Sequence, residues 1–201
     1  MKKSMVLKRV LVGVAFLFTG MAHATGTFNT VHFIEPGKMS FGLEPEITMT
    51  DGAGVAGNFK YTQGINELMN GAAIIGVGSG PRRFRIGGDL SFDFFPDVDK
   101  QPGIGLLTRV LYYRFPVSGE LQMLGAPYIH KAFALENKNE VEPYVLIPIG
   151  AGFDNGTYRW IGNFVVGSMF KNMDQFRYSF ELGINMNNSE TYISGGITYY
   201  P

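Results

Sequence analysis

Two histidines in residues 25–201, His32 and His130, are the side chains best suited to acid–base chemistry. A histidine paired with a serine or an acidic residue can act as a general base, as in many hydrolases. Neither histidine lies in a motif such as H-E-x-x-H or G-x-S-x-G. His130 follows Tyr128 on the polar side of an alternating segment, near its end. The sequence therefore predicts a hydrogen-bonded structural histidine and no catalytic residue, and we expect no enzyme activity.

Two other segments could be mistaken for ligand-binding loops. Gly76-x-Gly78-x-Gly80 lacks the Lys-Ser/Thr pair of a phosphate-binding loop, and no helical pattern follows it. Residues 96–100 carry two aspartates but lack the spacing of a calcium-binding loop. The chain contains no cysteine, so a thiolate metal site is excluded. We expect no metal site and no cofactor.

The strand-forming charges follow a regular pattern, because they fall on alternate positions between apolar neighbours. The set holds six basic and six acidic residues, as the sequence shows: Glu44, Glu46, Lys60, Arg83, Arg85, Asp89, Asp93, Arg109, Glu142, Arg159, Arg177 and Glu181. Charges removed from water must be paired, so an enclosed interior should hold near-equal numbers of each sign. We predict that these twelve residues form a charge network in such an interior.

The elements that must position these charges are strands, because apolar residues recur with a period of two. In residues 83–94 the apolar side includes Phe84 and Leu90, and in residues 176–187 it includes Phe180 and Ile184. Successive strand side chains point to opposite faces, so each segment has one apolar and one polar face. Turn signals divide residues 25–201 into about ten such strands (8–12), and short links require antiparallel neighbours. An additional strand at residues 27–34 would change this count.

The first 24 residues read as an export signal rather than as part of the fold. Four basic residues precede a nine-residue apolar stretch at 10–18, which is too short to span a bilayer. Ala22 and Ala24 supply the small residues of a cleavage site, so we predict a cleaved signal peptide at 1–24 and one domain at 25–201. Cleavage would leave 13 basic and 17 acidic residues, a net charge of −4. This balance argues against a nucleic-acid partner.

Composition favours an apolar outer face over an apolar interior. The proposed strands are 9–15 residues long, which suits the ~9–11 residues of a tilted membrane strand. Aromatic residues near strand ends would form girdles at the membrane interfaces. These are Phe94, Phe95, Tyr112, Tyr158, Trp160, Phe170, Phe176, Tyr199 and Tyr200. Four prolines inside proposed strands would each remove a ladder donor, so we expect bulges or strand ends at Pro45, Pro127, Pro143 and Pro148.

The pattern resembles the small outer-membrane β-barrel proteins of Gram-negative bacteria, such as the transmembrane domain of outer-membrane protein A and outer-membrane proteins X and W. The resemblance rests on the Ala22-His23-Ala24 ending, the alternating strands and the final strand at residues 192–200. It implies an all-β, antiparallel, up-and-down transmembrane β-barrel in the outer membrane. It also implies outer-membrane lipid and the barrel-assembly machinery as partners. The family's last strand usually ends in an aromatic residue, whereas Pro201 follows the final tyrosines here.

Three functions fit these observations. The first is an integral outer-membrane barrel with a structural or surface-interaction role or a narrow channel, because about ten strands leave little open lumen. The second is a soluble periplasmic barrel that, like a lipocalin, turns its Phe and Tyr residues inward around a hydrophobic ligand. The third is a barrel enzyme acting on lipids, with His130 as its base. The sequence assigns no oligomeric state.

Overall fold

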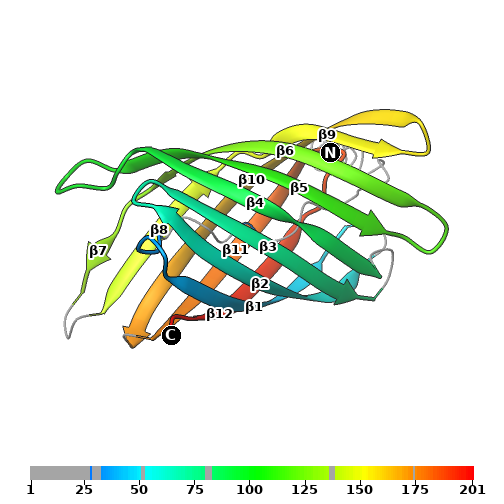
Figure 1. Ribbon diagram of the computed structural model, residues 1–201. Helices are drawn as coiled ribbons and strands as arrows, with labels where there is room; N and C mark the ends of the chain where they lie inside the picture. The colour runs from blue at the N-terminus through cyan, green and yellow to red at the C-terminus, as the bar shows by residue number, and fades with distance from the viewer. Residues whose placement is uncertain (1–27, 29–32, 51–52, 80–82, 136–138, 174) are drawn as a thin grey trace, which may run out of the picture.

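Every regular element that the structure describes is a β-strand (Figure 1). The computed structural model describes residues 28, 33–50, 53–79, 83–135, 139–173 and 175–201. The strands are β1 (Met39–Thr48), β2 (Gly54–Asn66), β3 (Met69–Gly78), β4 (Phe84–Phe95), β5 (Gly103–Arg114), β6 (Gly119–His130), β7 (Phe133–Ala134), β8 (Glu140–Leu146), β9 (Ile149–Asp154), β10 (Thr157–Met173), β11 (Phe176–Asn187) and β12 (Tyr192–Tyr199). The predicted signal peptide at 1–24 and His32 lie outside the described residues. No helix in the described part of the chain is long and apolar enough to cross a membrane.

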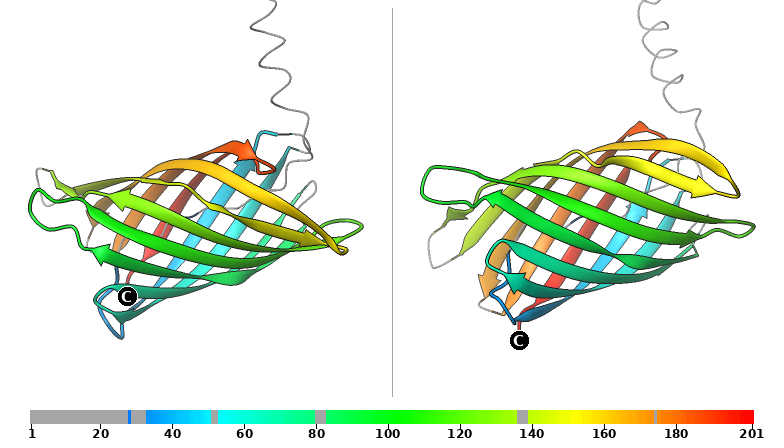
Figure 2. Two further views of the ribbon diagram at one scale, coloured as in Figure 1. Left: turned by 90° about the horizontal axis from the view of Figure 1, so that it is seen from above. Right: turned by 45° about the horizontal axis from the view of Figure 1, so that its top comes forward.

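The strands close into a barrel of ten wall strands. Consecutive strands pair antiparallel around the sheet, and β1 pairs with β12 to close it. β8 and β9 both pair with β6 on one side and with β10 on the other, so together they form one wall strand. β7 is a two-residue strand that pairs only with β8. The closed antiparallel barrel predicted from the alternation is thus confirmed, as the tilted strands of Figure 2 show.

Only one of the four strand prolines marks a strand end. Pro148 lies between β8 and β9. Pro45, Pro127 and Pro143 lie inside β1, β6 and β8 without a register shift, so the expectation was wrong for these three. Proline has no backbone N–H to donate, and this loss interrupts the ladder with one neighbouring strand only. The β1–β12 ladder skips residues 44 and 45, while the β1–β2 ladder is continuous.

The two faces of the wall are opposite in character. β11 shows this most clearly, because Phe180 is 57% exposed on the outside and the next residue, Glu181, is 0% exposed inside. On β4, Ile86 and Leu90 are exposed, whereas Arg85 and Asp89 are buried. The alternation therefore places apolar side chains outside and charged side chains inside.

Inward-facing tyrosines pack over glycines of the neighbouring strand. Tyr144 on β8 is paired with Gly167 on β10, and Tyr192 on β12 is paired with Gly183 on β11. A Cβ on Gly167 would lie 2.3 Å from the Tyr144 ring, and one on Gly183 would lie 2.0 Å from the Tyr192 ring. These glycines are required because the rings occupy the space of their missing side chains. Both rings are buried inside the barrel.

The start of the first wall strand, β1, and the end of the last, β12, lie at the same rim. An even number of wall strands brings the start of β1 beside the end of β12, where Phe41 pairs with Tyr199. We call this rim the terminal end. The two longest links between wall strands, residues 96–102 and 131–139, also lie at this end. Phe33 and Ile34, which precede β1, belong to no strand.

Candidate functional site

A buried ion-pair cluster lies in the middle of the barrel. Arg109 on β5 donates from Nε and Nη2 to the two carboxylate oxygens of Asp89 on β4, at 2.7 Å each. Lys60 on β2 places its ammonium 3.3 Å from the same carboxylate. All three side chains are buried. A bidentate arginine with a second cation on one carboxylate fixes all three side chains.

Glu46 and Arg85 form a second buried pair near this cluster. Arg85 Nη1 donates to Glu46 Oε2 at 3.1 Å, and the guanidinium lies 5.8 Å from the centre of the Tyr113 ring. Arg85 is on β4 and Glu46 is on β1, with two wall strands between them, so the pair crosses the interior. Cross-lumen pairs of this kind connect non-adjacent strands and rigidify the barrel.

Glu181 on β11 is the centre of a third cluster. Its carboxylate accepts hydrogen bonds from the hydroxyls of Tyr144 at 2.7 Å and Tyr192 at 2.5 Å. It also accepts the backbone N–H of Phe28, at 2.9 and 3.1 Å from its two oxygens. Three donors thus converge on this buried carboxylate. Glu181 therefore binds two tyrosine hydroxyls and the backbone N–H of Phe28 at the same time.

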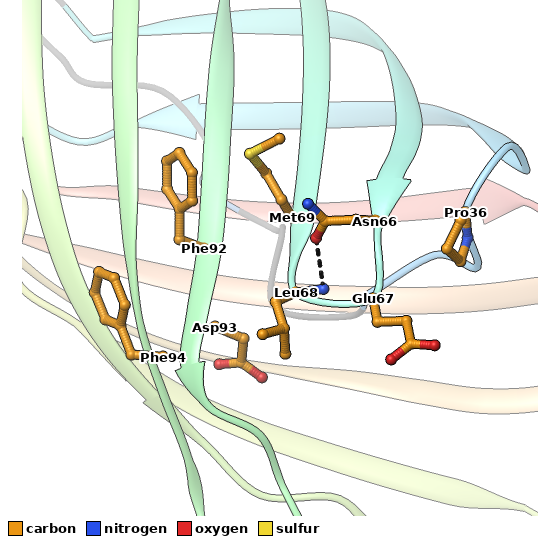
Figure 3. A pocket seen from close by; sticks show the side chains of 8 residues that line it. All are labelled: Pro36, Asn66, Glu67, Leu68, Met69, Phe92, Asp93 and Phe94. Carbon is orange, nitrogen blue, oxygen red and sulfur yellow. Dashed lines mark hydrogen bonds between the residues drawn. The ribbon is translucent and has the colours of Figure 1, made fainter.

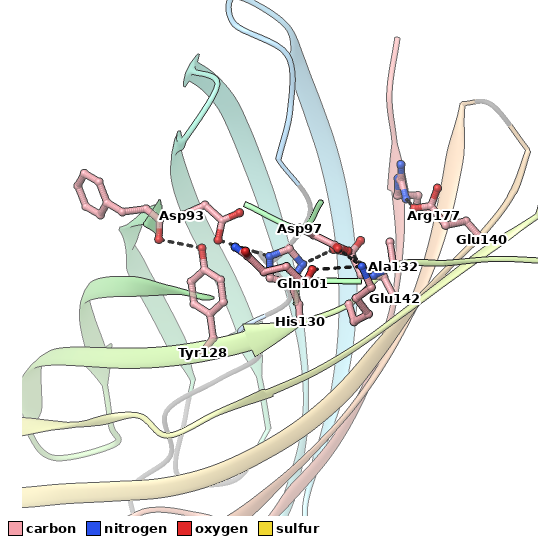
Figure 4. Close-up of polar contacts among 11 residues, drawn as sticks. Asp93, Asp97, Gln101, Tyr128, His130, Ala132, Glu140, Glu142 and Arg177 are labelled. Atoms are coloured by element: carbon pink, nitrogen blue, oxygen red, sulfur yellow. Dashed lines mark hydrogen bonds and ion pairs between the residues drawn. The ribbon is translucent and has the colours of Figure 1, made fainter. Parts of the chain in front are cut away.

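His130 lies between two carboxylates at the terminal end of the lumen (Figure 4). Its Nδ1 is 2.7 Å from Glu142 Oε1, and its Nε2 is 3.4 Å from Asp93 Oδ1. Tyr128, two residues earlier, donates to the carbonyl of Phe92 at 3.0 Å. Both ring nitrogens are thus engaged by carboxylates, and neither is directed at a hydroxyl nucleophile. Among the described residues, no group of His, Asp and Glu side chains is arranged to hold a metal ion.

Partly exposed pairs line the two rims. Arg177 donates to Glu140 at 3.2 Å at the terminal end, and its guanidinium lies 5.5 Å from the centre of the Tyr200 ring. Tyr200 was expected in an outer girdle, but this was wrong. It follows the inward parity of β12, and burial raises the pKa of its hydroxyl well above its usual range. At the opposite rim, Arg159 pairs with Glu120.

A salt bridge joins the two long links at the terminal end. Lys131 pairs with Asp97 and also donates to the carbonyls of Asp99 at 2.6 Å and Gln101 at 3.2 Å. The second oxygen of the Asp97 carboxylate accepts the N–H of Ala132 at 2.6 Å. This aspartate therefore connects residues 96–102 to the chain after β6.

The structure encloses ten of the twelve predicted network residues. Those buried are Glu44, Glu46, Lys60, Arg85, Asp89, Asp93, Arg109, Glu142, Arg177 and Glu181. Arg159 is partly buried at the rim beside Glu120. Arg83 departs from the prediction, because it is exposed and precedes β4, which begins at Phe84. Arg83 has the same parity as the inward-facing residues Arg85 and Asp89, but it lies before the first residue of β4, where the wall no longer encloses a side chain.

Several interior residues were missed in the sequence. Glu120 and Gln122 on β6 are fully buried, and Gln122 Nε2 donates to Glu120 Oε1 at 2.7 Å. Their alternation with exposed Leu121 and Met123 was a usable signal, although the following residues obscured it. Phe28 gave no signal, because a single aromatic residue before the first strand has no periodic context.

Two pockets border the terminal end. The first has a volume of about 780 Å³. Figure 3 shows its lining residues, which are Pro36, Asn66, Glu67, Leu68, Met69, Phe92, Asp93 and Phe94. A second cavity, of about 480 Å³, is lined by Phe33, Ile34, Glu35, Lys38, Met39, Gln175, Arg177, Tyr200 and Pro201. The first lies between the β2–β3 turn and the end of β4. Asp93 contributes to both that cavity and the His130 cluster, so the lumen network extends to this rim.

Comparisons with known proteins assign no role to this chain. The sequence matches no family model and no curated protein. The chain is similar to a structure from the de novo design of transmembrane β-barrels, with 14% identity and a TM-score of 0.42 over 85% of this chain and 100% of that chain. It is also similar to the de novo designed protein TMB2.3, solved by solution NMR, with 13% identity and a TM-score of 0.38 over 83% of this chain and 95% of that chain. The fold assignment rests on the strand pairing itself.

Proposed function

We propose that this chain is an integral outer-membrane β-barrel protein of a Gram-negative bacterium and not an enzyme. Its role is structural or lies in surface interaction, and its interior forms at most a narrow channel. The observation that carries the proposal is the inversion of the wall, with buried charges inside and large apolar side chains outside. A membrane barrel needs this arrangement, because its outer face meets lipid and its interior is polar.

The outer apolar belt supports a lipid environment. Its exposed residues on the wall strands include Leu43, Ile47, Val55, Phe59, Ile75, Val77, Ile86, Leu90, Phe94, Ile104, Val110, Met123, Ile129, Phe153, Trp160, Phe180, Ile184, Ile193 and Ile197. Soluble monomers rarely expose contiguous apolar patches above roughly a few hundred Å². The belt surrounds the barrel on all ten wall strands, so water would be an unfavourable solvent for it.

Aromatic contacts near both ends of the strands also support membrane insertion. At one end, Tyr158 lies 5.6 Å from Phe153 and 5.8 Å from Trp160, measured between ring centres. At the terminal end, the rings of Phe176 and Tyr199 are 5.2 Å apart. Amphipathic aromatic rings are favoured at the headgroup level, where they anchor a barrel at two depths.

The filled interior argues against a general diffusion pore. Barrels of about eight strands hold an interior that side chains fill, whereas open aqueous channels use 16–18 strands. Here the interior of ten wall strands contains three buried carboxylate clusters with their arginine, lysine and tyrosine partners. A closed or narrow passage follows from this packing.

The soluble, lipocalin-like alternative does not fit the positions of the aromatic residues. That function needs the phenylalanines and tyrosines of residues 84–94 and 176–186 around a central cavity. Phe94, Tyr178 and Phe180 are exposed on the outer face instead. The enzyme alternative has weaker support as well, because both nitrogens of His130 face carboxylates.

Membrane extraction tests the proposal directly. We expect the protein to remain in the membrane pellet after carbonate and urea washes, and to migrate faster on a denaturing gel before heating than after. Release into the soluble fraction without heat-modifiable migration would contradict it. Outer-membrane lipid and the barrel-assembly machinery are the partners that we propose, from the resemblance of the strand pattern.

A further inference from the structure

One residue from the segment before β1 lies inside the barrel. Phe28 is 0% exposed and is separated by 153 positions in sequence from Glu181, which accepts its N–H. Lys60 Nζ lies 3.4 Å from the Phe28 carbonyl oxygen. The Arg109 guanidinium lies 4.0 Å from the centre of the Phe28 ring. The N–H, the carbonyl and the ring of one residue are thus each held by a different wall strand.

The groups that hold Phe28 are themselves fixed by other parts of the wall. Glu181 is held by the hydroxyls of Tyr144 and Tyr192. Arg109 and Lys60 both pair with Asp89. These contacts do not involve Phe28, so the carboxylate, the ammonium and the guanidinium are positioned in advance. A preorganised site of this kind binds its occupant without a large ordering cost.

The remaining side of the Phe28 ring meets the apolar part of the lumen. Phe28 belongs to a buried cluster with Leu107, Leu124, Ala126, Tyr128, Tyr144, Leu146, Ile161, Val165 and Met169. Phe33 packs against the same cluster, and the N–H of Ile34 donates to Asn70 Oδ1 at 3.3 Å. Phe33 and Ile34, which precede β1, therefore also contact the inner face of the barrel.

We propose that the lumen contains a receptor site for a peptide unit with an aromatic side chain, and that Phe28 fills it as a tethered plug. The site is made of Glu181 for the N–H, Lys60 for the carbonyl, and Arg109 with the apolar cluster for the ring. Phe28 closes the lumen at the level of the central charges. Removing the ring opens a passage bordered by Lys60, Asp89 and Arg109.

The lack of cysteine in the chain makes the plug testable by chemical replacement. Phe28→Cys introduces the only thiol. In urea, this thiol attacks benzyl methanethiosulfonate, forms a mixed disulfide that carries a phenyl ring, and releases methanesulfinate. Methyl methanethiosulfonate gives the matched adduct without a ring. Phe180→Cys is the control, because Phe180 is adjacent to Glu181 in sequence but lies on the outer face.

Conductance across a planar bilayer is the measurement. We expect the refolded Phe28→Cys protein and its methyl adduct to conduct severalfold more than the wild type, and the benzyl adduct to return to the wild-type level. All forms of Phe180→Cys should conduct as the wild type does. Equal conductance of Phe28→Cys and wild type, or of the benzyl and methyl adducts, would overturn the plug.

The conductance measurement rests on the proposed membrane barrel, so a second readout separates the two. In detergent micelles, a maleimide should react far more slowly with folded Phe28→Cys than with the same variant unfolded in urea without detergent. Equal rates would overturn the plug even where membrane insertion succeeds, and slow reaction supports it even where insertion fails. If Phe28→Cys does not refold, Phe28→Leu keeps an apolar side chain but loses the ring face toward Arg109. It should conduct more than the wild type, and wild-type conductance would count against the site.

Discussion

Removing Arg109 should destabilise the barrel strongly, because it leaves a buried carboxylate short of its main partner. In Arg109→Met, Asp89 loses two charge-assisted hydrogen bonds of 2.7 Å and keeps the contact with Lys60 at 3.3 Å. Breaking a buried pair in this way costs about 3–5 kcal/mol. Lys60 moderates the loss, so we expect the free energy of unfolding to fall by about 3 kcal/mol.

The cost of Arg109→Met is compared with the cost of breaking a more exposed ion pair at the rim. Glu140→Gln removes the partner of Arg177, but the Glu140 side chain is 30% exposed. Exposed pairs contribute about 0.2–1 kcal/mol, so Glu140→Gln should cost less than about 1 kcal/mol. The contrast between the two variants isolates the effect of burial.

Urea unfolding in lipid vesicles, followed by heat-modifiable migration and intrinsic fluorescence, gives both free energies. The double variant Asp89→Asn with Arg109→Met removes the carboxylate but also the 3.3 Å contact of buried Lys60, so its cost should differ from the sum of the two single variants by more than about 0.5 kcal/mol. If Arg109→Met costs less than about 1 kcal/mol, the Asp89 carboxylate is hydrated or otherwise compensated. The account of a desolvated central cluster would then be refuted.

Substitutions at three other features of the barrel test them separately. Gly183→Ala should destabilise the barrel, because its Cβ would lie 2.0 Å from the Tyr192 ring, whereas Gly57→Ala should be tolerated because nothing lies within 4 Å; urea midpoints compare the two. Leu90→Arg, at an exposed position halfway along β4, should cost about 2–4 kcal/mol in vesicles if this position faces the bilayer centre, and an unchanged unfolding curve would contradict a lipid-facing wall. His130→Ala should leave the lipid composition of expressing cells unchanged, as thin-layer chromatography would reveal, and an altered lipid A would favour the enzyme alternative.

The period-two pattern predicted the wall strands and their faces because those depend on neighbours in sequence. Residues 83–94 and 176–187 alternate cleanly, and β4 and β11 occupy nearly the same ranges, Phe84–Phe95 and Phe176–Asn187. Arg83 shows the limit of parity. Alternation gives the side to which a residue points but not where the enclosing wall stops.

Two strands without clean alternation of polar and apolar residues, β5 and β6, line the apolar part of the lumen. On β5, Leu107 and Leu111 are buried, and on β6, Leu124 and Ala126 are buried, although the opposite face of both strands is also apolar. A strand that is apolar on both faces shows no contrast between parities. In these strands, only polar residues such as Glu120 on β6 and Arg109 on β5 mark the inner face in the local sequence.

The division of the lumen into a charged part and an apolar part explains why an aromatic peptide unit fits there. Glu181 on β11 and Lys60 on β2 present polar groups from one side, while Leu107 on β5 belongs to the apolar cluster that meets the ring. A peptide unit has a donor and an acceptor that must be satisfied when buried, and a phenyl ring needs an apolar or cationic surface. Phe28 meets all of these requirements at the boundary between the two parts. A fully charged lumen would leave the ring in unfavourable surroundings, and a fully apolar lumen would leave its backbone groups without partners.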